Sequence, residues 1–137
     1  MSDDNLAIAE RFYVALESDD VDATLALCGD RVEVVYPGAG HVPYGGRWSG
    51  HDGIVSFLTT HDAAEEILEF EVASMVADGE TVAAFGTFRG RARPSGGEWS
   101  TRFVHRLTIS GALLRRWEAY FDTAAAVVAH SGGGSAD

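Results

Sequence analysis

The sequence predicts an α+β fold in which helices come first and an antiparallel sheet of long strands follows. Near the N-terminus, apolar residues recur every three or four positions, which is the spacing of an amphipathic helix. From Glu69 onward the spacing changes to two, which is typical of strands. The turn at Asp78-Gly79 makes neighbouring strands antiparallel. Helices that cover one face of a curved sheet in this way would enclose a conical cavity.

The first part of the chain predicts three helices and one strand. The apolar face of the first helix comprises Leu6, Ala9, Phe12, Tyr13 and Leu16. Asp19-Asp20 breaks that pattern and can cap a second helix from Val21 to Cys28. A strand from Arg31 to Tyr36 precedes a glycine-rich loop, and a third helix runs from about Asp52 to Thr60.

The second part predicts four strands and a short helix. The first strand begins at Glu69, and the next three run from Thr81 to Arg93, from Glu98 to Ile109 and from Ala112 to Tyr120. The short helix covers Ala124 to Ala129. A length of 137 residues suits one domain, which we place at residues 1–130. Residues 131–137 are rich in Gly and Ser and are predicted to form a flexible tail with no packing role.

The charge of the chain argues against nucleic acid and membrane surfaces as partners. Acidic residues outnumber basic ones by 21 to 10, every base is arginine, and the net charge is −11. Such a field repels phosphate backbones and anionic lipid. Cys28 is the only cysteine, which leaves no internal disulfide and no cysteine-rich zinc site. With no signal-peptide pattern and no apolar run that spans a bilayer, we expect a cytoplasmic protein.

Several short sequence motifs occur one after another along the chain. They are Phe12-Tyr13, Asp19-Asp20 with Leu25, Asp30 to Val34, the approach Tyr44 to Gly50 into a helix, Arg102 to His105, and Trp117 to Asp122. In this order and spacing the chain resembles the SnoaL-like branch of the nuclear transport factor 2-like superfamily, over roughly residues 5–129. The resemblance implies a cone-shaped, mostly antiparallel sheet covered by N-terminal helices, a buried pocket, and homodimers packed through the sheet.

The resemblance leaves more than one function open, because this fold serves several. Relatives include ketosteroid isomerase, limonene epoxide hydrolase, SnoaL-type polyketide cyclases and non-enzymatic binding modules. We therefore expect an apolar pocket for a small cyclic or polyketide-like ligand. The chemistry would be cofactor-independent acid/base catalysis: isomerisation, aldol cyclisation or elimination. The alternative is a non-catalytic ligand-binding or dimerisation module of the same fold.

Strand alternation selects the residues that would face the pocket, once the resemblance fixes the face of His105 as inward. On the first strand this choice turns Glu33 and Val35 inward, and on the last strand Leu113, Arg115, Trp117, Ala119 and Phe121. On the middle strand the inward set is Val82, Ala84, Gly86, Phe88 and Gly90. The predicted ligand-pocket residues are Leu16, Val35, Tyr36, Trp48, Phe57, Phe88, Trp99, Phe103, Trp117 and Phe121.

His105 and Glu33 are the first two candidate catalytic residues. A histidine among aromatics can act as acid or base near neutral pH, and SnoaL-type cyclases similarly have a histidine on this strand. The alternative is a core histidine held by a hydrogen bond. An inward Glu33 would gain proton affinity from desolvation, as a general base requires. The alternatives for Glu33 are a solvated rim position and an ion pair with Arg115.

Two further candidates are Tyr13 and Asp122. Tyr13, like Tyr36, can donate a hydrogen bond to an enolate or carbonyl oxygen, although aromatic packing explains both tyrosines nearly as well. Asp122 can orient a catalytic histidine or cap the last helix.

Metal and nucleotide sites find no support in the sequence. His41, His51 and His61 lie near one another, but their spacing matches no metal motif. We therefore expect neither a metal nor a cofactor.

The catalytic residues of known relatives are not all matched here. The resemblance places a catalytic acid of epoxide hydrolases and cyclases at or near Ala119, and the inward Arg and Asp of the hydrolases near Gly86 and Phe88. Ketosteroid isomerases have a base aspartate where Tyr36 precedes Pro37. The reactions of these relatives therefore cannot be assigned directly to this chain.

The outer face of the sheet is predicted to be locally basic. Alternation turns Arg89, Arg91, Arg93, Arg102, Arg106 and Arg116 away from the pocket. On an acidic chain this suggests a surface that docks the acidic groups of a second copy, giving a homodimer.

Overall fold

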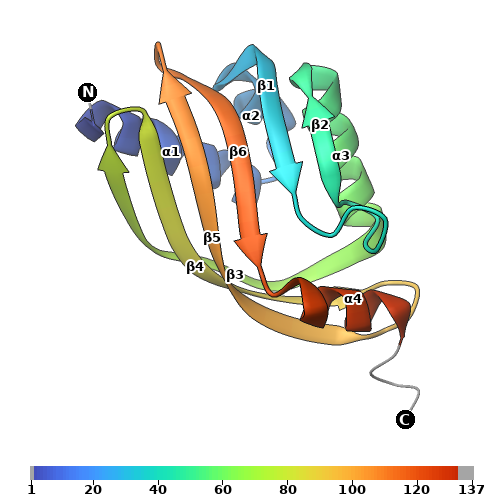
Figure 1. Cartoon of the computed structure of the whole chain (residues 1–137). Coiled ribbons are helices and arrows are strands. Elements are labelled where there is room, and N and C mark those ends of the chain that lie inside the picture. Colours follow the sequence, from blue (N-terminus) through green and yellow to red (C-terminus); the bar gives the residue numbers. More distant parts are fainter. Residues whose placement is uncertain (1, 133–137) are drawn as a thin grey trace.

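The computed structural model describes residues 2–132, which form a strongly bent sheet with helices packed against it (Figure 1). The elements in chain order are α1 (Ser2–Glu17), α2 (Val21–Ala26), β1 (Cys28–Tyr36), β2 (Gly46–Ser49), α3 (Gly50–Ala64), β3 (Glu65–Asp78), β4 (Thr81–Ala92), β5 (Glu98–Ser110), β6 (Leu113–Phe121) and α4 (Thr123–Ser131). None of the helices in this range is long and apolar enough to cross a membrane.

The six strands form one sheet in the order β2-β1-β6-β5-β4-β3. Neighbouring strands are antiparallel except β1 and β6, which run parallel. The predicted α+β class with a curved, mostly antiparallel sheet is therefore confirmed. We call the face that carries Phe103, His105 and Trp117 the inner face, and the opposite one the outer face.

Several predicted boundaries were wrong. The second helix ends at Ala26 and Cys28 already belongs to β1. The segment Gly46–Ser49 forms a short edge strand, although Gly46 had been assigned to the glycine-rich loop. Helix α3 extends to Ala64, and β3 begins at Glu65 rather than at Glu69. The early part of β3 escaped prediction because Glu65-Glu66 reads as a solvated end of a helix.

Strands β3 and β4 bend together at two glycines. The register between them shifts between Ile67 and Glu69, next to Gly90, and again between Val72 and Ser74, next to Gly86. Each shift inserts an extra residue in β3, and such bulges increase the local bend of a sheet. A Cβ atom on Gly86 would lie 2.0 Å from the carbonyl oxygen of Glu71 and 2.6 Å from the ring of Phe103. The tight bend therefore requires glycine at this position.

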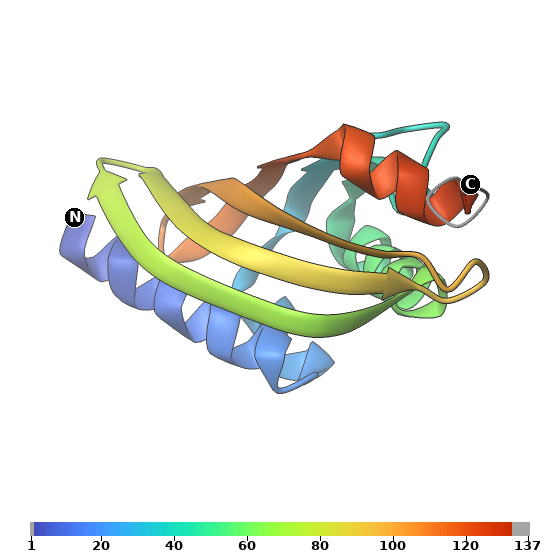
Figure 2. The same cartoon turned by 90° about the horizontal axis from the view of Figure 1, so that it is seen from below.

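Helix α1 runs along the inner face, under the arch of β3 and β4 (Figure 2). Its residues Phe12 and Tyr13 are buried against the sheet. Near its start, the Asn5 amide donates hydrogen bonds to the carbonyls of Gly79 (2.9 Å) and Ile109 (3.3 Å). These bonds fix the helix to the ends of two hairpins, so the position of Tyr13 relative to the sheet is set.

Helix α4 packs against the far end of β5. Its carboxylate cap is Asp122, which accepts a hydrogen bond from the Ala125 amide (3.1 Å), and Ala126 and Ala129 are buried. The helix ends at Ser131, and Gly132 follows in the left-handed conformation (φ 73°). The first two residues of the predicted tail therefore belong to this helix end, and residues 133–137 lie outside the described residues.

The inward-facing residues predicted from strand alternation are correct on β4 and β5 but wrong in part on β6 and β1. On β6 the register shifts between Thr108 and Ile109 of the facing strand, so Leu114 is buried and Arg115 is exposed. The inward orientation predicted for Leu113 and Arg115 was therefore wrong, whereas Trp117 and Ala119 are buried as predicted. In the second half of β1 the buried residues are Val32 and Val34, so the predicted inward orientation of Glu33 and Val35 was wrong.

We expect Gly86→Ala to destabilise the protein by about 3 kcal/mol or more, since the added methyl group collides with backbone on one side and an aromatic ring on the other. Urea denaturation followed by circular dichroism measures the loss. The matched control is Thr87→Ala on the same strand, whose side chain is exposed and whose cost should stay near 0.5 kcal/mol. Equal stabilities of the two variants would contradict the role of Gly86.

Candidate functional site

A cavity of about 830 Å³ lies between the inner face of the sheet, helix α3 and the junction of α1 with α2. Aromatic rings make up most of its apolar wall. The rings come from Tyr36, Tyr44, Phe57, Phe70, Phe88, Trp99, Phe103, Trp117 and Phe121. A mostly apolar cavity of this volume with a few polar groups is typical of a small-molecule site.

The structure places most of the predicted pocket residues in this wall. Leu16, Tyr36, Phe57, Phe88, Trp99, Phe103, Trp117 and Phe121 all line it. Val35 does not, because it points to the outer face of β1. Trp48 does not line it either: its ring packs behind Phe57, with centroids 5.8 Å apart, and its indole N–H donates to the Tyr44 carbonyl.

His105 and Tyr13 form a buried hydrogen-bonded pair at one end of the cavity. The Tyr13 hydroxyl lies 2.8 Å from Nδ1 of His105, and both residues are less than 5% exposed. The two rings stack at 5.8 Å, and Phe103 and Trp117 pack around the imidazole. His105 is part of the cavity wall, whereas Tyr13 lies behind it on α1.

The direction of the Tyr13–His105 hydrogen bond follows from which of the two groups can donate and which can accept a proton. Burial raises the pKa of Tyr13, so its hydroxyl keeps its proton and needs an acceptor. Among residues 2–132 the only acceptor within reach is Nδ1 of His105. Tyr13 therefore donates to Nδ1, which places the imidazole proton on Nε2. No described residue hydrogen-bonds Nε2, so this N–H is available to a ligand.

Burial also keeps His105 neutral. Desolvation disfavours the imidazolium and lowers the pKa of His105 from 6.5 to about 3. A neutral imidazole with a fixed proton on Nε2 is a hydrogen-bond donor at neutral pH and a weak base. This geometry does not support a simple proton acceptor at His105.

Two other predicted catalytic residues lie away from the cavity. Glu33 is on the outer face of β1, with its carboxylate 3.3 Å from Arg47 and 3.4 Å from Arg116. The expectation that it faces the cavity was wrong, and its partners are not the Arg115 considered from sequence. Asp122 caps α4, and its carboxylate has no contact with a histidine in the described part of the chain.

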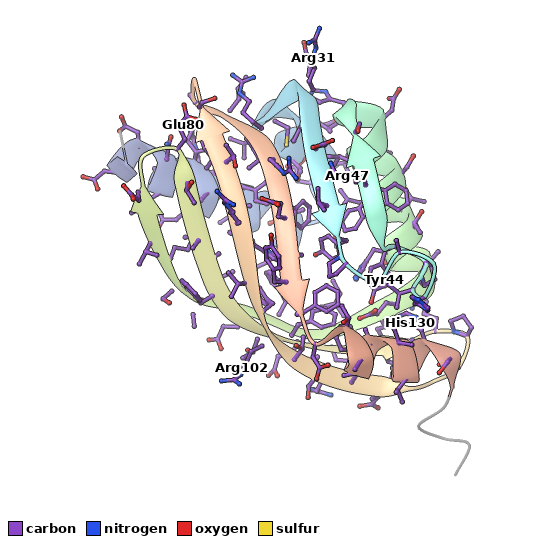
Figure 3. The ribbon with its side chains drawn as sticks, viewed as in Figure 1. Arg31, Tyr44, Arg47, Glu80, Arg102 and His130 are labelled. Atoms are coloured by element: carbon purple, nitrogen blue, oxygen red, sulfur yellow. The ribbon has the colours of Figure 1, made fainter. Side chains whose placement is uncertain are left out.

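The opposite end of the cavity holds a buried carboxylate that the sequence did not reveal. Glu65, at the start of β3, is 1% exposed. Its Oε1 accepts hydrogen bonds from the Tyr44 hydroxyl (2.7 Å) and from Nε2 of His130 (2.8 Å). Its Oε2 accepts one from the Trp99 indole (3.1 Å). Figure 3 shows Tyr44 and His130 side by side, although one belongs to the loop before β2 and the other to α4.

Gly90 is the one sequence signal that could have pointed to this carboxylate. A Cβ atom there would lie 2.2 Å from Oε2 of Glu65, so only glycine leaves room for it. An isolated glycine within a strand often marks such a close approach. The other members of the cluster are 21 to 65 positions from Glu65 in the sequence, and no local pattern connects them.

The remaining histidines have separate environments. His61 lines the cavity beside Tyr44, with ring centroids 4.6 Å apart, and burial lowers its pKa although nearby Glu65 opposes that effect. His51 lies 3.0 Å from the Cys28 carbonyl, and His41 is exposed in the loop. Within residues 2–132 no three His, Cys, Asp or Glu side chains come together as a metal site.

Comparisons with known proteins agree with this architecture. The SnoaL-like domain family model matches residues 9–117. No curated protein matches the chain. An NTF2-like protein from Burkholderia xenovorans LB400 is 25% identical, with a TM-score of 0.88 over 95% of this chain and 98% of that one. An NTF2-like protein of unknown function from Burkholderia pseudomallei K96243 is also 25% identical, with a TM-score of 0.83 over 96% and 99% of the two chains.

A third similar structure is that of TerC, which was co-crystallised with polyporic acid. The sequence of TerC is 26% identical to this chain. The TM-score is 0.83, and the likeness covers 93% of this chain and 98% of TerC. The family match spans most of the helices and strands described above, and the solved structures share their arrangement. This chain therefore belongs to the SnoaL-like domain family, and its fold is NTF2-like.

Proposed function

We propose that the aromatic cavity binds a small cyclic ligand and that His105 polarises an oxygen atom of that ligand. The observation that carries this proposal is the Tyr13–His105 pair, which leaves the Nε2–H of a neutral imidazole without a protein acceptor in the described residues. TerC, which shares the fold and was co-crystallised with polyporic acid, supports the proposal that a protein of this fold takes a small-molecule ligand.

A fixed N–H donor suits reactions that develop charge on a carbonyl oxygen. Isomerisation, aldol cyclisation and elimination next to a carbonyl all pass through an enolate or a related oxyanion. A donor that is already in place stabilises that charge without reorganisation, and neutral imidazole can fill this role. In this proposal His105 is a catalytic residue, and Tyr13 is a positioning residue that fixes its tautomer.

These reactions also need a group that accepts a proton from carbon, and we assign that part to His61. It lines the cavity, its lowered pKa keeps it neutral, and no hydrogen bond to it is found within residues 2–132. Glu65 is less suitable, because three donors of the protein already occupy its fully buried carboxylate.

The alternative is a binding module of the same fold that converts nothing. The enclosed aromatic wall favours ligand binding in both cases, so the two differ only in turnover. In a catalyst, removal of the His105 donor would abolish conversion of a cognate ligand while binding survives. In a binding module, tight binding would occur with no conversion. A cytoplasmic location and the absence of cofactor and nucleic acid stay predictions from the sequence.

The outer face of the sheet supports a second proposal, a homodimer. Phe85, Val104 and Tyr120 lie in register across β4, β5 and β6, and Phe85 and Tyr120 are 40% and 53% exposed. Arg102 and Arg106 lie on either side of Val104 on β5, and neither has an ion pair within residues 2–132. Figure 3 shows Arg102 pointing away from the sheet.

The face as a whole is less basic than the sequence suggested. Arg89, Arg91 and Arg116 are paired with glutamates of the same chain, while Arg93 pairs with Asp62. The free arginines and the apolar strip remain, and Glu71 of a second copy is a suitable acidic partner because it is exposed and unpaired among the described residues. We therefore propose that two copies pack through β4, β5 and β6.

The first prediction concerns binding of a matched pair of probes, 2-acetylnaphthalene and 2-ethylnaphthalene. Both should quench the fluorescence of Trp99 and Trp117, which line the cavity. In the double variant Tyr13→Phe with His105→Phe, the ketone should bind about 3- to 10-fold more weakly, because one hydrogen bond is lost. The hydrocarbon should bind as before. Replacing both partners avoids a buried hydroxyl without an acceptor.

The control for this experiment is His41→Ala, since His41 is exposed outside the cavity. It should change neither affinity. If neither probe binds the wild-type protein, or if the double variant weakens both probes equally, the proposed role of the cavity and of His105 is wrong.

The second prediction concerns pH. The pKa of His105 is about 3 in the folded protein and near 6.5 when unfolded, so acid protonates the unfolded chain first. This part of the free energy of unfolding is fully present above pH 6.5 and is lost as the pH falls toward 3, by about 1.4 kcal/mol per pH unit. His105→Gln, whose amide oxygen can still accept from Tyr13, should remove that slope in urea titrations between pH 4 and 6.

Nitrogen-detected NMR of the histidines gives an independent readout of the same pKa. His105 should stay neutral with its proton on Nε2 from pH 7.5 down to 5. A midpoint for His105 near 6.5 would overturn the assignment of a neutral donor.

The third prediction concerns assembly. Arg102→Glu should weaken the dimer at least about tenfold, as measured by sedimentation equilibrium, because it places like charges opposite one another. Adding Glu71→Arg to the same chain should restore dimerisation, since the interfacial charges are then exchanged. Arg31→Glu is the matched control, because Arg31 lies at the far end of the molecule (Figure 3). A wild-type protein that stays monomeric at all concentrations would refute the proposal.

A further inference from the structure

The cavity wall holds two tyrosines, and only one of them has a hydrogen-bond partner in the protein. Tyr44 donates to Glu65 at 2.7 Å. The hydroxyl of Tyr36 makes no hydrogen bond to any residue of the described chain. The indole Nε1 of Trp117 is also unpaired, but it is covered by protein atoms, whereas the Tyr36 oxygen is not. Because Tyr36 lines the cavity, its hydroxyl is open to a ligand there.

Tyr36 and His105 lie in one row across the sheet, two strands apart. Val35 lies opposite Glu118 in the register of β1 and β6, so Tyr36 comes next to Ala119, and Ala119 lies opposite His105 on β5. Parallel side chains two strands apart would be about 9.5 Å from each other. The ring centroids of Tyr36 and His105 are only 6.4 Å apart. The two side chains therefore converge over the small side chain of Ala119.

The Tyr36 ring is held in place by its neighbours. It packs against Phe57, Trp117 and Phe121, with ring centroids 4.6, 5.6 and 5.8 Å away. Its backbone is the last pair of the β1–β2 ladder, opposite Gly46. A donor that is fixed in this way needs no reorganisation when a ligand arrives, which is the condition for strong stabilisation of a developing charge.

The Tyr36 hydroxyl keeps its proton. Burial raises the pKa of Tyr36, and the negative charge of Glu65 raises it further. An ionised Tyr36 would in turn raise the pKa of Tyr13, so its hydroxyl is within electrostatic reach of the Tyr13–His105 pair. A phenol in this state donates a hydrogen bond and does not take a proton from carbon. Tyr36 therefore does not replace the aspartate base that ketosteroid isomerases have at this place.

We propose that Tyr36 is a second catalytic residue, whose hydroxyl donates to the same ligand oxygen as Nε2 of His105. This inference rests on the proposed function, because it adds a donor to the oxygen that His105 polarises. Two fixed donors from different strands stabilise the negative charge of an enolate oxygen more than one does. They also place that oxygen over Ala119, between the two rings.

The test uses 2-acetylnaphthalene, a probe with a single oxygen atom, and 2-ethylnaphthalene, which has none. In Tyr36→Phe the ketone should bind about 3- to 10-fold more weakly, because one hydrogen bond is lost, and the hydrocarbon should bind as before. The double variant Tyr13→Phe with His105→Phe should show a loss of similar size. The matched control is Tyr120→Phe on the outer face, where Tyr120 is 53% exposed, and it should change neither affinity.

Infrared spectroscopy of the bound ketone shows whether the two donors share one atom. The carbonyl group is labelled with carbon-13, so that its stretching band is separated from those of the protein. Each hydrogen bond to the oxygen lowers the stretching frequency. The band should therefore move to higher frequency in Tyr36→Phe and again when the His105 donor is also removed, and it should stay in place in Tyr120→Phe.

Stability without a ligand separates a ligand-binding hydroxyl from a structural one. Tyr44→Phe removes a donor from the buried Glu65 carboxylate and should lower the midpoint of urea unfolding. Tyr36→Phe makes the same chemical change on the same wall, but it removes no hydrogen bond within the described chain and should leave the midpoint unchanged. If Tyr36→Phe lowers the midpoint as much as Tyr44→Phe, the hydroxyl serves the fold and the inference is overturned.

The binding results distinguish this inference from the proposed function. If Tyr36→Phe leaves the affinity for the ketone or its carbonyl band unchanged, while the double variant at Tyr13 and His105 changes both, only the role of Tyr36 is refuted. If neither variant distinguishes the ketone from the hydrocarbon, or if neither probe binds the wild-type protein, the proposed function falls as well.

Discussion

The cavity depends on the bend that β3 and β4 share, and the bend depends on Gly86 and Gly90. Both glycines belong to the inward set of β4, where a side chain would fill the space that the bend opens. At Gly86 that space is taken by the ring of Phe103 and by the backbone of β3, and at Gly90 by the carboxylate of Glu65. The two glycines therefore allow the sheet to curve, and they leave the space that the ring of Phe103 and the buried carboxylate of Glu65 occupy. A flat sheet of the same strands would have neither an enclosed cavity nor a place for Glu65.

Burying that acid is costly unless donors compensate for the lost water. The three donors come from the loop before β2, from β5 and from α4, so they also connect elements that are far apart in the sequence. Glu65 is among the residues around the cavity, but its side chain is 0% exposed. The three donors hold its carboxylate in one orientation, so Glu65 joins these elements and fixes the aromatic residues beside it.

Much of the fold was readable from the sequence, since long strands with regular alternation reveal their faces. His105, Phe103 and Trp99 were assigned correctly because β5 pairs with β4 without interruption. The assignment failed for Arg115, where a bulge shifts the phase of β6, and bulges have no clear signature in a single sequence. It failed for Glu33 because β1 carries valines on both faces, so alternation alone could not choose between them. The cluster around Glu65 depends on contacts between distant segments, which no local pattern encodes.

The chemistry at His105 is decided by Tyr13 rather than by the histidine alone. If Nδ1 carried the proton and donated to Tyr13, the buried phenol hydroxyl would itself lack an acceptor within the described chain, at a cost of about 1–3 kcal/mol. The opposite arrangement satisfies both groups and presents Nε2–H to the cavity. Trp99, beside Glu65, and His105 are six residues apart on β5, or roughly 20 Å along the strand. The cavity thus has an available hydrogen-bond donor at one end, whereas the carboxylate at the other end is occupied by donors of the protein itself. In the proposed function a ligand would therefore place its oxygen atom at the His105 end, and this donor would set the orientation of the ligand along the cavity.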